Sequence, residues 1–71
     1  MRERTLGGVM ADAKVSQEEL SKAIEMSRST LNRKMNTGNF TVIEIGKICR
    51  YLKLSDPILI FDIFLRPVFH F

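Results

Sequence analysis

Apolar side chains recur every three or four residues along most of the chain, as they do on one face of a helix, and no stretch alternates as a strand would. The first of these patterns predicts a helix from about Glu3 to Ala13, with Leu6 and Met10 on its buried face. Gly7 and Gly8 interrupt this helix, and each interior glycine costs up to about 1 kcal/mol relative to alanine. We therefore expect the helix to depend on tertiary packing.

Two capping boxes mark the starts of further helices. In a capping box, a Ser or Thr hydroxyl accepts a hydrogen bond from the amide three residues on, and the glutamate at that position accepts one from the amide of the Ser or Thr. Ser16 and Glu19 form the first pair and open a helix that ends near Glu25. Thr41 and Glu44 form the second pair.

The helices that follow these caps have clear apolar faces. Leu20, Ala23 and Ile24 lie on the buried face of the first, and Val15 precedes its cap. The second carries the most apolar stripe of the chain and is expected to anchor the core. Its members are Val42, Ile45, Ile48, Cys49 and Leu52.

Another helix is predicted between these two, capped by Ser27 and running to about Met35, with Leu31 facing inward. Residues 36–39 form a turn by composition, in which Gly38 suits a positive φ.

A fifth helix begins at Asp56 and Pro57 and stops before Pro67. The fold class is therefore all-α, a compact arrangement of five short helices. We expect one domain over residues 1–71, with its core at about 3–65 and an apolar tail at 66–71.

Length and composition exclude several classes of protein. A chain of 71 residues is too short for a buried catalytic cleft with its own supporting layer. Its one cysteine, Cys49, cannot form an internal disulfide, and with one histidine, His70, no zinc cluster is expected. The longest apolar run, 58–61, is far below the roughly 20 residues that span a bilayer. We expect no enzyme, metal, cofactor or membrane segment, and an intracellular location.

The net charge of +3 is concentrated in one segment. Residues 26–43 hold Arg28, Arg33 and Lys34 and no acidic side chain, whereas basic and acidic residues balance in the rest of the chain. The other exposed positions of this helix are Ser, Thr and Asn. These side chains hydrogen-bond phosphates and base edges, so the helix is predicted to bind nucleic acid.

Residues 17–36 resemble the helix-turn-helix of the lambda repressor and Cro-like family, also called the xenobiotic-response-element family; they read QEELSKAIEMSRSTLNRKMN. The resemblance covers about residues 3–65, and residues 40–54 are similar to the fourth helix of that family. Two positions depart from the pattern. Ser21 stands where the family usually has alanine, and Glu25 stands where a glycine usually adopts the left-handed conformation.

The resemblance implies that the third helix enters the major groove of double-stranded DNA. It places base contacts on Arg28 and Ser29, with Asn32 and Arg33 one turn further, and a phosphate contact on Gln17. Ser27 and Ser29 also suit a helix start, and residues 36–38 suit a helix stop. The candidate DNA-binding residues are Gln17, Ser27, Arg28, Ser29, Thr30, Asn32, Arg33, Lys34, Asn36, Thr37 and Asn39.

The C-terminal segment has more apolar surface than the fifth helix of a small domain needs. In the family, the last helix often forms a two-fold dimer contact, for which the candidates are Phe61, Phe64, Leu65 and Phe69. The alternative is that these side chains pack onto the first and fourth helices of their own chain.

The sequence thus predicts a sequence-specific transcriptional regulator. We interpret it as a phage-type or mobile-element repressor that binds a palindromic operator as a homodimer, in the cytoplasm and at the nucleoid of a prokaryote. The alternative is an antitoxin-like module of the same fold that binds a protein partner through the Phe-rich segment.

Overall fold

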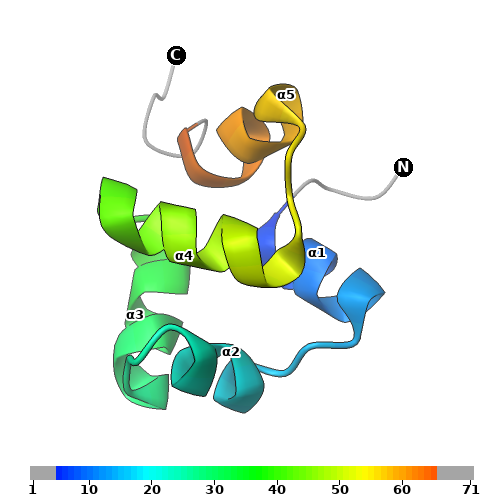
Figure 1. The fold of residues 1–71 in the computed structure, drawn as a ribbon. Coiled ribbons are helices and arrows are strands. Elements are labelled where there is room, and N and C mark those ends of the chain that lie inside the picture. Colours follow the sequence, from blue (N-terminus) through cyan, green and yellow to red (C-terminus); the bar gives the residue numbers. More distant parts are fainter. Residues whose placement is uncertain (1–4, 66–71) are drawn as a thin grey trace.

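Five α-helices in the predicted order make up most of residues 5–65, the part of the chain that this computed structural model describes (Figure 1). No strand occurs in this range, so the all-α prediction is confirmed. A π-helical turn, η1, continues the fifth helix. The elements are α1 (Leu6–Ala13), α2 (Gln17–Ala23), α3 (Arg28–Thr37), α4 (Val42–Leu52), α5 (Pro57–Ile60) and η1 (Phe61–Leu65).

The helices are arranged around α4. Helix α2 packs against both α3 and α4. Figure 1 shows α2 and α3 on one side of α4 and α5 with η1 on the other. None of the helices in the described range is long and apolar enough to cross a membrane.

Helix starts follow the predicted caps. The side chains of Ser16, Ser27 and Thr41 accept hydrogen bonds from the amides three residues on, at 3.0, 3.2 and 3.1 Å. At Thr41 the box is complete, because the Glu44 carboxylate accepts from the Thr41 amide at 2.9 Å.

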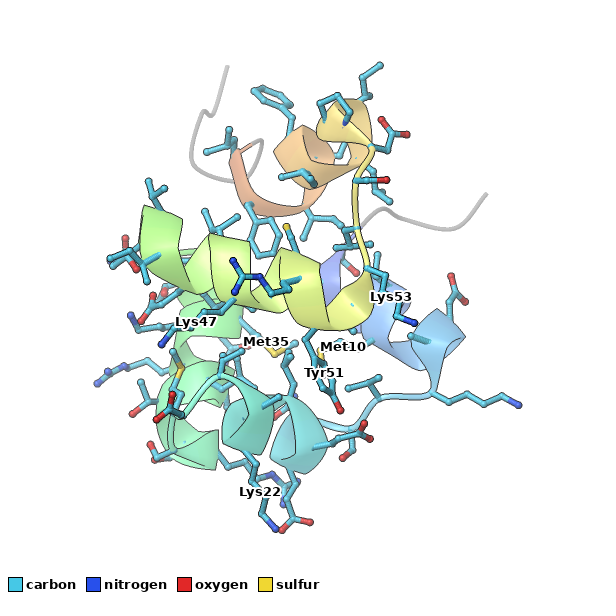
Figure 2. The ribbon with its side chains drawn as sticks, in the orientation of Figure 1. Met10, Lys22, Met35, Lys47, Tyr51 and Lys53 are labelled. Atoms are coloured by element: carbon cyan, nitrogen blue, oxygen red, sulfur yellow. The ribbon has the colours of Figure 1, made fainter. Side chains whose placement is uncertain are left out.

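The box predicted at Ser16 is only half formed. The Glu19 carboxylate accepts a hydrogen bond from the Tyr51 hydroxyl of α4 instead of from the Ser16 amide. Tyr51 points from α4 toward α2 (Figure 2). A contact between helices has therefore replaced a local one, and it joins α2 to α4.

One residue from each of three helices is fully buried at the centre of the core. These are Leu20 of α2, Leu31 of α3 and Ile48 of α4, each with no exposed surface. The inward orientation predicted for these three residues is thereby confirmed, whereas Ala23, predicted on the same face as Leu20, is exposed at the end of α2. The other buried apolar residues are Leu6, Met10, Ile24, Ile63 and Phe64.

The apolar stripe predicted for α4 is wrong at its first position. Val42 is 84% exposed, because the first turn of α4 lies at the edge of the molecule (Figure 1), and the packed face begins at Ile45. Neighbouring Ile43 is also exposed.

The fifth helix differs from the prediction in length and regularity. Asp56 caps it and Pro57 occupies its first position as expected, but the α-helix ends at Ile60. The π-helical turn that follows places Ile63 and Phe64 in the core. No glycine or proline lies in residues 58–65, so the hydrophobic pattern gave no sign of this change of winding.

Phe64 belongs to the core of its own chain. Its ring meets Phe40 edge to face, with centroids 5.6 Å apart, and it is 2% exposed. Phe64 therefore packs within its own chain, against Phe40 of the segment before α4, and is almost fully buried there. Phe61 and Leu65 are exposed, whereas Phe69, Pro67 and the predicted helix start at Glu3 lie outside the described residues.

Two isoleucines of α4 allow a matched test of this core. Ile48→Ala should lower the free energy of unfolding by about 2–5 kcal/mol, because it leaves a cavity between α2, α3 and α4. Ile43→Ala, on the same helix but at a side chain 72% exposed, should change it by less than about 0.5 kcal/mol. Urea denaturation measures both, and equal losses would contradict the assigned core.

Candidate nucleic-acid interface

The turn between α2 and α3 accommodates both departures from the helix-turn-helix pattern. Ser21 is buried, and its hydroxyl donates a hydrogen bond to the carbonyl of Glu18 at 2.8 Å, so no polar group is left without a partner. Glu25 adopts the left-handed conformation at φ 58°, as the glycine of the pattern would. The Met26 amide then donates to the carbonyl of Ser21 at 2.8 Å and closes the turn.

Helix α3 is held by one face and exposed on the other. Leu31 is fully buried and Met35 is half-buried against the core. At helical spacing, this leaves four polar residues of the N-terminal two turns pointing away from the core. They are Arg28, Ser29, Asn32 and Arg33, and all four are exposed.

Two helix N-termini meet on this exposed side. An open depression is lined by Gln17 from the start of α2 and by Arg28, Ser29 and Asn32 from the start of α3. The first amides of a helix lack partners within the helix, so anions bind well at helix N-termini. The structure thus brings together four of the predicted DNA-binding residues from two elements.

Ser27 and Thr30 are engaged with one another beside this depression. The Ser27 hydroxyl caps α3 and also donates a hydrogen bond to the Thr30 hydroxyl at 2.7 Å. Ser29 lies 3.4 Å from the Ser27 oxygen. These hydrogen bonds stabilise the start of α3, so the capping role predicted for Ser27 is confirmed.

The residues that end α3 have a structural role as well. Gly38 takes the predicted positive φ, 73°, and the Thr37 hydroxyl donates to the Arg33 carbonyl at 3.1 Å. Asn36 and Asn39 are exposed on either side of this helix end. Phosphate binding by these residues stays a prediction.

Lys34 is placed differently from the two arginines of α3. Its ammonium forms an ion pair with Glu44 of α4, 2.8 Å from each carboxylate oxygen. Hydrogen bonding to Lys34, and then to the Thr41 backbone, holds the pKa of the Glu44 carboxyl below its usual value. Within residues 5–65, no acidic side chain pairs with Arg28 or Arg33.

Two contacts between helices were not predicted from the sequence. One joins Lys34 of α3 to Glu44 of α4, and the other joins Tyr51 of α4 to Glu19 of α2. Glu44 and Glu19 were assigned to caps, and only the folded chain brings Lys34 and Tyr51 to them. A signal was present for the first pair, since Lys34 and Glu44 lie on either side of a short predicted turn. No such signal links Glu19 with Tyr51, which are far apart in the sequence.

The described range offers no cluster of metal ligands, and its one cysteine is partly buried. No three His, Cys, Asp or Glu side chains there are placed to hold a metal ion. Burial raises the pKa of the half-buried Cys49 thiol, which disfavours the reactive thiolate.

Residues 5–57 match the family model described as the Cro/C1-type HTH DNA-binding domain. The chain belongs to this family. The matched range runs from the cap of α1 to the first residue of α5 and contains the whole helix-turn-helix. Comparisons with curated proteins and with solved structures give no significant match.

Membership confirms the resemblance predicted from residues 17–36. The Cro/C1-type family is a family of DNA-binding regulators and not a family of enzymes. Helices α2 and α3 are its helix-turn-helix.

The conformation of Glu25 gives a test of the turn. Glu25→Gly should raise the free energy of unfolding by about 0.5–1 kcal/mol. Glycine avoids the cost of about 1–2 kcal/mol that the left-handed conformation imposes on other residues. Part of this gain is lost, because glycine also increases the conformational entropy of the unfolded chain. Glu25→Ala retains the Cβ atom and should bring no such gain. Thermal unfolding of the two variants compares them, and equal stabilities would argue against a left-handed residue 25.

Proposed function

We propose that this Cro/C1-type protein is a repressor of phage or mobile-element type, which binds a palindromic operator as a homodimer and blocks a promoter by occupying it. The observation that carries the proposal is the open depression at two adjacent helix N-termini, which half-buried Gln17 and the exposed residues Arg28, Ser29 and Asn32 line together. Such a protein works in the cytoplasm, at the nucleoid of a prokaryote.

Base reading falls to the first turns of α3. Arg28 is the first residue of that helix and is exposed, so its guanidinium can form two hydrogen bonds to O6 and N7 of a guanine. Such a contact discriminates between bases by about 1–3 kcal/mol. Asn32 lies one turn further along the helix and suits adenine, whereas the Ser29 hydroxyl can hydrogen-bond to a purine or to a pyrimidine.

Phosphate contacts surround this reading face. Gln17 is the first residue of α2, where the first amides and the helix dipole favour an anion. Arg33 and the exposed Asn36, Thr37 and Asn39 continue the polar surface past the end of α3. These contacts fix the orientation of the domain without reading sequence.

Dimerisation is proposed through the apolar side chains that α5 and η1 leave exposed. Ile58 is 66% exposed, and Phe61 and Leu65 are about two-fifths exposed. A two-fold contact there would set two recognition helices about one DNA turn, roughly 34 Å, apart. The same exposed surface also supports the second candidate function, an antitoxin-like module that binds a protein partner.

The proposal predicts the outcome of selection from a random duplex library. The native protein should retain a palindromic sequence, and Arg28→Gln should lose preference at one base pair of each half-site, by about 1–3 kcal/mol. Sequencing of the retained DNA measures this. Lys53→Gln removes the same charge at the end of α4 away from α3 (Figure 2) and should leave the preference unchanged.

Retention without any preferred sequence would contradict operator recognition. Absence of retention at low salt would leave the protein-binding function as the better account. A preferred sequence without two-fold symmetry would argue against the dimer alone.

A further inference from the structure

The three basic residues of α3 do not contribute equally to its positive surface. Arg28 and Arg33 are exposed, whereas the Lys34 side chain is 20% exposed and its charge is offset by the carboxylate of Glu44. The positive charge that the sequence concentrates in residues 26–43 is therefore partly neutralised in the fold by an acid that lies just beyond this segment.

Glu44 holds Lys34 with both carboxylate oxygens. Oε1 accepts from the Lys34 ammonium at 2.8 Å and from the Thr41 amide at 2.9 Å, and Oε2 accepts from the same ammonium at 2.8 Å. The hydrogen bond from the Thr41 amide restrains the Glu44 side chain, so the cap helps to hold the carboxylate in place beside the lysine. The pair is also partly shielded from water, since the Glu44 side chain is 21% exposed.

Lys34 would have other partners without this acid. It lies in the last turns of α3, next to the exposed residues that end the helix and that the proposed function assigns to phosphates. A lysine ammonium is a point charge on a flexible four-carbon stem, so it can bind a phosphate from several positions. Each such contact strengthens binding to any duplex, whatever its sequence.

We propose that Glu44 withholds the Lys34 ammonium from the DNA phosphates and so limits sequence-independent binding by this domain. The inference rests on the proposed DNA-binding function and adds a specificity-determining residue to it. Glu44 acts through Lys34 and does not itself touch DNA.

The test is the salt dependence of binding to a short duplex of mixed sequence. Glu44→Gln removes the charge but keeps a side chain that can cap α4, since glutamine also serves in capping boxes. With Lys34 released, the log–log slope should steepen by about 0.9. Between about 50 and about 200 mM salt, this equals an additional loss of affinity of about 3.5-fold.

Two further variants separate this effect from a general change of charge. Lys34→Met keeps the length of the stem without its ammonium, and its slope should equal that of the native protein. Adding Glu44→Gln to Lys34→Met should leave the slope unchanged, because no ammonium remains to be released. Circular dichroism checks that every variant is folded.

The inference is overturned if Glu44→Gln keeps the native slope, if Lys34→Met flattens it by about 0.9, or if the double variant steepens as much as Glu44→Gln alone. In all three cases the native protein still binds DNA, and the proposed function stands. Absence of salt-dependent binding by the native protein would overturn the proposed function and the inference together.

Discussion

Burial of Leu31 in one cluster with Leu20 and Ile48 is the constraint on which the rest of the structure depends. The three side chains come from α3, α2 and α4 and have no exposed surface. Once Leu31 faces inward, the period of the helix determines which residues of α3 face outward. The buried side of α3 thus determines which polar residues its exposed side presents. A helix as short and polar as α3 would be unstable in isolation, so it depends on this packing.

The turn before α3 meets a second requirement, that α2 and α3 approach closely. Ser21 is small, and its hydroxyl is satisfied by the carbonyl of Glu18, so it fits in the contact without an unpaired polar group. Glu25 takes a conformation that costs a non-glycine residue about 1–2 kcal/mol. The buried neighbours Leu20, Ile24 and Leu31 offset this cost, because they hold the two helices at the geometry that the turn must connect.

Much of this structure could be predicted from the sequence, because its causes are local. The hydroxyl caps, the positive φ of Gly38 and the inward faces of α2 and α3 depend on residues within one or two turns of each other. The exposure of Val42, the π-helical turn that buries Phe64 and the partners of Glu19 and Glu44 were not predicted. Each depends on which helix lies nearby, which hydrophobic periodicity does not specify.

For the candidate site, the sequence indicated the helix but not the charge that it displays. Counting Arg28, Arg33 and Lys34 treats them alike, whereas the fold pairs one of them, Lys34, with Glu44.

The measurement that tests the account most directly is an NMR titration of the labelled protein with duplex DNA, followed through its backbone amides. The account predicts that the shifts concentrate at the start of α2 and along α3. Shifts confined to α5 and η1, or the absence of shifts at low salt, would contradict it.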